Sequence, residues 1–164
     1  MKKLKHLSIL IALIFNFSLS GNVFAETEES ASTIEHEEHE HEHHAPHNGT
    51  LVVFGDEFAH LELVLDSASG KLTAYALDGE AEYAVRLKQE AIEISVSVND
   101  NNATLKLNAV DNPLTGEVVG DTSEFAAQSD LLKGVKNFKG AITKIDIKGT
   151  EFNNVEFRFP EGNE

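Results

Sequence analysis

Apolar and polar residues alternate with a period of two over most of the chain after residue 48, a pattern typical of strands with one buried face. The stretch 59–66 (AHLELVLD) shows it most clearly, because leucines occupy every second position. Turn-forming glycine, asparagine and aspartate residues separate such stretches at intervals of about eight to twelve residues. The sequence therefore predicts an all-β fold, a small antiparallel β-sandwich of about eight to nine strands, with a small closed β-barrel as the alternative.

The predicted strands are short, as is usual in small antiparallel domains. A longer loop at 111–122 and a short helical turn at 130–134 interrupt their succession, while residues 99–102 and 148–150 read as hairpin tips. The strands are predicted at residues 51–54, 59–66, 71–77, 83–87, 92–98, 104–110, 123–127, 141–147 and 152–159.

The first 25 residues have the layout of a secretory signal peptide. Three lysines precede the apolar run 7–15, and small residues lead to a cleavage position after Ala25. The apolar run is shorter than the roughly 20 residues of a membrane-spanning helix. We therefore expect an exported protein, most simply a periplasmic one, with no membrane insertion after signal cleavage.

Two parts of unlike composition follow the predicted signal peptide. Residues 26–47 contain eight glutamates, six histidines and almost no apolar bulk, so they cannot bury enough surface to offset the entropy of ordering. We expect them to form a disordered tail. Residues 48–164 carry the apolar alternation and are long enough for one β-domain with its own core.

Charge and sulfur content narrow the possible ligands. The chain has 13 basic and 28 acidic residues, and loss of three lysines with the signal peptide leaves 10 basic residues and a net charge of −18. Such a chain repels nucleic acid and anionic lipid and attracts cations. Because cysteine is absent and the single methionine is Met1, metal ligands must be imidazole or carboxylate groups.

The most informative segment is 35–47 (EHEEHEHEHHAPH), with six histidines and five glutamates in thirteen residues. Imidazole is the commonest protein ligand for borderline divalent ions and is mostly neutral near pH 7. This composition predicts binding of a divalent ion, with Zn(II), Cu(II), Ni(II) and Co(II) all open. Its predicted ligands are the imidazoles of His36, His39, His41, His43, His44 and His47.

A second predicted site lies in the folded domain. Within 59–66 the leucines share one face and should point to the core, which places His60 and Glu62 side by side on the outer surface. A turn centred on Asp56 would set Thr50 opposite Glu62 and bring His47 within reach of that carboxylate. The predicted site is thus His47, His60 and Glu62.

Four short motifs carry a resemblance to a known group of proteins. They are Pro46-His47-Asn48-Gly49, Gly55-x-x-x-Ala59-His60-x-Glu62, Leu77-Asp78-Gly79 and Phe138-Lys139-Gly140. Together they resemble small exported bacterial His-rich proteins with a Pro-His-Gly-Gly start, which are similar to modules of periplasmic heavy-metal efflux adaptor (membrane fusion) proteins. The resemblance implies an all-β periplasmic module linked to metal handling, with His47, His60 and Glu62 at matching positions. Asn48 stands where that group has glycine, although asparagine also tolerates left-handed backbone.

The sequence favours metal binding over catalysis. It contains no G-x-S-x-G elbow, no H-E-x-x-H helix and no glycine-rich phosphate loop, so we expect no enzyme. The predicted function is capture, buffering or delivery of a divalent metal ion to an efflux system. Two alternatives stay open, a non-catalytic module that docks on a metal-efflux adaptor or transporter, and a structural exported protein whose acidic tail is a spacer.

Overall fold

The computed structural model of the chain describes residues 43–163, which form eight antiparallel strands in one sheet. The predicted signal peptide and residues 26–42 of the predicted tail lie outside the described residues. The strands are β1 (Thr50–Phe54), β2 (Ala59–Asp66), β3 (Lys71–Leu77), β4 (Ala91–Val98), β5 (Asn101–Ala109), β6 (Glu124–Gln128), β7 (Phe138–Ile147) and β8 (Thr150–Phe159).

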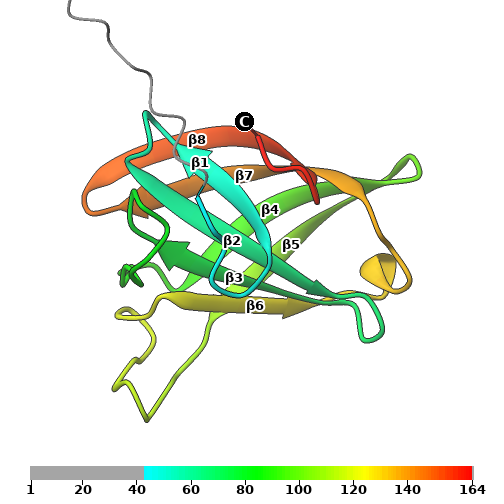
Figure 1. Ribbon diagram of the computed structural model, residues 1–164. Helices are drawn as coiled ribbons and strands as arrows, with labels where there is room; N and C mark the ends of the chain where they lie inside the picture. The colour runs from blue at the N-terminus through cyan, green and yellow to red at the C-terminus, as the bar shows by residue number, and fades with distance from the viewer. Residues whose placement is uncertain (1–42, 164) are drawn as a thin grey trace, which may run out of the picture. The chain divides into compact units, whose positions relative to one another are not determined.

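The sheet is strongly curved and nearly closes on itself, as Figure 1 shows. Its strand order is β1-β2-β3-β6-β5-β4-β7-β8, so β1 and β8 are the two edges. The predicted all-β antiparallel class is confirmed. Because all eight strands belong to a single sheet, the arrangement corresponds to the barrel-like alternative.

The residues after β8 cover the gap between the two edge strands. The Asn163 side chain accepts a hydrogen bond from the Val53 N–H at 2.8 Å and donates one to the Val53 carbonyl at 3.1 Å. The Thr50 hydroxyl donates to the Pro160 carbonyl, also at 3.1 Å. These contacts satisfy backbone groups of β1 that an open edge would leave to solvent.

The inward-facing side chains of all eight strands form one hydrophobic core. Alternation along β2 places Leu61 and Leu63 in it with no exposed surface, as predicted. Phe54 of β1 and Phe125 of β6 are the largest fully buried side chains. Each such residue contributes about 1.5–3 kcal/mol by burial, so the core rather than any disulfide stabilises the domain.

Two of the predicted hairpin tips are two-residue turns. Both residues of the β4–β5 turn, Asn99 and Asp100, have positive φ (47° and 66°), as do Lys148 and Gly149 of the β7–β8 turn (53° and 85°). Positive φ at both central residues matches the twist of the flanking strands. These tight turns let β5 and β8 begin closer to the tip than predicted, at Asn101 and Thr150, while β4 and β7 end at the predicted residues 98 and 147.

The predicted strand at 83–87 is wrong. The structure has only isolated bridges there, Leu77 with Ala84 and Leu87 with Thr122. The helical turn predicted at 130–134 is a short 3₁₀ helix, η1 (Asp130–Leu132). Within the part of the chain that the structure describes, no helix has the length and apolar character to cross a membrane.

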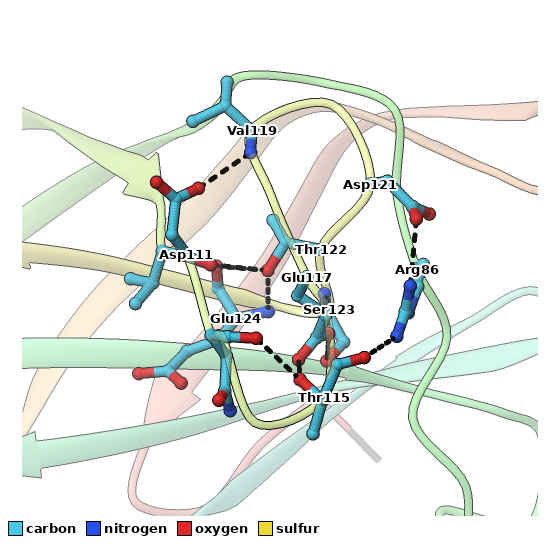
Figure 2. Close-up of polar contacts among 11 residues, drawn as sticks. Arg86, Asp111, Thr115, Glu117, Val119, Asp121, Thr122, Ser123 and Glu124 are labelled. Atoms are coloured by element: carbon cyan, nitrogen blue, oxygen red, sulfur yellow. Dashed lines mark hydrogen bonds and ion pairs between the residues drawn. The ribbon is translucent and has the colours of Figure 1, made fainter.

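The loop predicted at 111–122 is organised around the carboxylate of Glu117, which is 6 % exposed. Figure 2 shows this network. One Glu117 oxygen accepts from the backbone N–H and hydroxyl of Ser123 (2.8 and 2.6 Å), and the other from the Thr115 hydroxyl (2.6 Å). Arg86 ties the same loop down through the Asp121 carboxylate (2.9 Å) and the Thr115 carbonyl (2.6 Å). The loop is therefore held by polar contacts instead of a core.

Glu117→Gln tests this network by its dependence on pH. Burial disfavours the charged carboxylate, but the Ser123 and Thr115 hydrogen bonds outweigh burial and hold the pKa of Glu117 below its ordinary value of 4.5. Its stabilising effect is therefore present above the unfolded pKa and is lost as pH falls through the folded pKa. We expect the substitution to lower the free energy of unfolding by about 1–2 kcal/mol near neutral pH and by less in acid. Urea unfolding at several pH values measures both effects.

Glu156→Gln, on the exposed side of β8, is the matched control and should leave stability nearly unchanged. A Glu117→Gln protein whose stability falls with acid as steeply as that of the native protein would contradict this role of Glu117.

Candidate functional site

Both faces of β2 are covered over its first half, and this determines the geometry of the candidate site. Leu61 and Leu63 face the core, and His60 and Glu62 face the opposite side, as the alternation predicted. However, His60 and Glu62 are also fully buried, not exposed at the surface. The cover comes from residues 43–49, which run beside β2, and from the turn after β3. Alternation tells the face of a residue but not whether another segment lies over that face.

Glu62 binds the segment that precedes β1. Its Oε1 accepts hydrogen bonds from the backbone N–H groups of His47 and Gly49, both at 2.8 Å. Its Oε2 accepts a hydrogen bond from His47 Nδ1 at 2.7 Å. Three donors therefore compensate the loss of hydration of a carboxylate with no exposed surface. We call this arrangement the Glu62 clasp.

The clasp also fixes the His47 ring. Because a carboxylate only accepts, His47 Nδ1 carries the hydrogen of this bond, and Nε2 takes no part in the clasp. The ring stacks on Tyr75, with centroids 3.9 Å apart and planes 13° apart, and its side chain is 44 % exposed. Tyr75 lies opposite Glu62 on β3; burial, followed by the charges of Glu124 and Glu62, raises the pKa of its hydroxyl.

The backbone at residues 48 and 49 lets the segment approach β2 closely. Asn48 has a φ of +56°, a left-handed conformation that asparagine tolerates. A Cβ on Gly49 would lie 2.6 Å from the Leu63 carbonyl oxygen and 2.7 Å from Glu62 Cγ. Only glycine fits at residue 49 while both N–H bonds to Glu62 are kept.

His60 is held in one orientation from the turn after β3. Its Nδ1 lies 3.0 Å from the Asp78 carbonyl oxygen, which only accepts, so Nδ1 is the donor. The other ring nitrogen, Nε2, is buried and has no hydrogen-bond partner among the described residues. The close approach of this turn requires Gly79, because a Cβ there would lie 2.3 Å from the Glu57 carbonyl oxygen. His60 thus presents a lone pair in a buried place.

The ring of His43, which belongs to the histidine-rich run, packs against the ring of His60. Its ring centroid lies 4.8 Å from that of His60, and its side chain is 6 % exposed. Its Nε2 lies 3.1 Å from Glu57 Oε1 in the β1–β2 turn. This hydrogen bond raises the pKa of His43; burial works against the shift, and the Glu80 backbone and the charges of Glu57 and Glu80 add to it.

The structure splits the predicted three-residue site into two pairs. His47 meets Glu62, as predicted, whereas His60 lies against His43. Among residues 43–163, no three histidine, aspartate or glutamate side chains already surround one point as a metal site would require. His44 is exposed beside these pairs. Three predicted ligands of the run, His36, His39 and His41, lie outside the described residues.

The predicted strand register was wrong by one residue. Glu62 pairs with Leu51 and His60 with Val53, because the turn has four residues and is centred between Asp56 and Glu57. The prediction that His60 and Glu62 lie on the same face of β2 is nevertheless confirmed, since it depends only on alternation within β2.

Sequence reasoning missed three contributors to the site. They are the Glu57 carboxylate, the Asp78 carbonyl and the Tyr75 ring. Asp78-Gly79-Glu80 was predicted as a turn and is one, but nothing in its composition indicates that its backbone would bind His60. Gly79 was the one sequence signal for this contact, because a glycine in such a turn often marks a close approach of two backbones.

An open groove of about 950 Å³ lies elsewhere, along β4, β5, β7 and β8. Lys139, Glu156 and Arg158 line it together with small polar residues, and none of the predicted metal ligands does. The groove and the histidine pairs are thus separate features of the domain.

Comparison of the chain with known protein families, with characterised proteins and with solved structures finds no match. Arguments about function therefore rest on the residues themselves.

Glu62→Gln tests the clasp. Glutamine keeps one carbonyl oxygen as acceptor for the two backbone donors. Its NH₂ group, however, is itself a donor and cannot accept from His47 Nδ1, and the side chain carries no charge. We expect the free energy of unfolding to fall by about 1–3 kcal/mol, with faster proteolysis around residues 43–49. Urea unfolding and limited proteolysis measure the two effects.

Glu93→Gln, on the exposed face of β4, is the matched control for loss of one carboxylate. Equal stability and equal proteolysis of the two variants would show that Glu62 does not hold the segment.

Proposed function

We propose that this protein is an exported, periplasmic binding protein for divalent metal ions, which captures and buffers ions and delivers them to an efflux system. One observation carries the proposal: the end of the histidine-rich run is fastened to the domain, and there the His43 ring lies 4.8 Å from the ring of His60, whose Nε2 is buried and has no partner among the described residues. A histidine with one nitrogen bonded to a carbonyl and the other free has the form of a metal ligand.

The proposal assigns different work to the two parts. The run of alternating histidines and glutamates offers many nitrogen and oxygen ligands in a short, strongly acidic length of chain. Such sites bind borderline ions such as Zn(II), Cu(II), Ni(II) or Co(II) without strict geometry. The domain holds the last histidines of the run in fixed positions beside β2.

The resemblance to efflux adaptor modules supports the same proposal. His47, His60 and Glu62, which match its motifs, are three of the residues that fasten the run to the domain or face it. The proposed partners are therefore metal ions and a heavy-metal efflux adaptor or transporter. We propose binding and transfer, with no catalytic step.

A docking module is the second candidate function, and a specific observation favours it. The tip of the loop held by Glu117 exposes Leu114, Val118 and Val119, which are 97 %, 55 % and 52 % exposed. Apolar side chains presented on an ordered loop are suited to contact with another protein. Docking and metal binding are compatible, because this loop and the histidine pairs involve different residues.

Replacing His36, His39 and His41 by glutamine tests the role of the run. We expect the exported chain, residues 26–164, to bind more than one Zn(II) per molecule and the variant to bind fewer. Calorimetric titration measures the stoichiometry. The matched control replaces Glu37, Glu38 and Glu40 by glutamine, which removes charge but no imidazole.

If the histidine variant bound as much Zn(II) as the native chain, the run would not be a metal collector. If the native chain bound none, metal binding itself would be excluded, and the docking module would be the better account.

A further inference from the structure

We propose that His43, His60 and Glu57 form one defined binding site for a divalent metal ion. The inference rests on the proposed function and deepens it, because it assigns a ligand set to the folded part of the chain. It differs from the site predicted from sequence, in which His47 and Glu62 were to join His60. Glu62 is excluded as a ligand because its two oxygens are already bound by three N–H donors.

The first ligand is the Nε2 atom of His60. Leaving a buried polar atom without a partner is destabilising, and native structures contain few such atoms. A bound ion would supply the missing partner. The Asp78 carbonyl, 3.0 Å from Nδ1, holds the hydrogen on that nitrogen. It therefore orients His60 as a backbone carbonyl orients a metal-bound histidine.

The second ligand is His43, and the distance between the rings fits. Two imidazoles bound to one tetrahedral ion, with metal–nitrogen distances near 2.0 Å, have centroids roughly 5 Å apart. The centroids of His43 and His60 are 4.8 Å apart, with planes at 50°.

The third ligand is the Glu57 carboxylate. Its Oε1 lies 3.1 Å from His43 Nε2, close to the separation of roughly 3.4 Å expected between nitrogen and oxygen ligands of one tetrahedral ion. The side chain is 52 % exposed, so it is free to swing towards an ion without disturbing the core. On binding, the ion replaces the hydrogen between His43 and Glu57, and that proton is released.

Three protein ligands leave one position of a tetrahedral ion open. A water molecule would fill that position. The charge around the site also favours a cation, because Glu57 and Glu80 both act on the His43 ring. A site with one exchangeable position is suited to receive an ion from the run and to release it to a partner.

Affinity for Zn(II) in the exported chain tests the site. His36, His39 and His41 are first replaced by glutamine, which removes competing sites. In that background we expect His60→Gln and His43→Gln each to weaken the Zn(II) affinity at least about tenfold, measured by competition with a chelator. Glu57→Gln should weaken it less, and Asp56→Asn, in the same turn, is the matched control.

Far-ultraviolet circular dichroism and thermal unfolding show whether each variant folds. If His60→Gln fails to fold, His43→Gln decides the matter, because His43 lies outside the core. Unchanged affinity in His43→Gln, or in a folded His60→Gln protein, overturns the site while leaving metal capture by the run intact. Absence of Zn(II) binding by the unaltered exported chain overturns the proposed function as well.

Discussion

The buried carboxylate of Glu62 is the constraint on which the site depends. It stands on a fully covered stretch of β2, where an unpaired charge would be strongly destabilising. Segment 47–49 supplies the three N–H donors that compensate it, so the segment and the carboxylate require each other. Gly49 permits the approach and Asn48 makes the turn. The clasp thus holds the end of a charged, histidine-rich run against the side of a β-domain.

Fastening the run at its end has a chemical consequence. His47 and His60 each have Nδ1 engaged, by a carboxylate and a backbone carbonyl, and neither bond involves Nε2. The His47 side chain is partly exposed, whereas the Nε2 atom of His60 is buried and has no partner among the described residues. In the proposed function, an ion gathered by the run would meet fixed ligands at the end of the run, which lowers the entropy cost of forming a defined site. The composition of the run and the geometry of the domain thus support the same proposed function.

Most of the fold could be predicted because it depends on local rules. Alternation gives the strands and their buried faces, and Asn99-Asp100 and Lys148-Gly149 mark tight turns. The register of the first hairpin could not be predicted, because Gly55-Asp56-Glu57 is compatible with odd and even turn lengths. The candidate site depended on contacts distant in sequence. The proximity of His47 to Glu62 was predicted, but the burial of His60 depends on the turn at Asp78 and on His43, and neither leaves a signal in β2.

The most direct test of this account is the protonation of His60, read from the chemical shifts of its two ring nitrogens in a ¹⁵N NMR spectrum of the exported chain without added metal. The account predicts hydrogen on Nδ1, because the Asp78 carbonyl accepts from it, and none on Nε2, because that buried nitrogen has no acceptor among the described residues. It also predicts that only Nε2 shifts strongly when Zn(II) is added. A ring with hydrogen on Nε2, or a spectrum of His60 that Zn(II) leaves unchanged, would contradict the account.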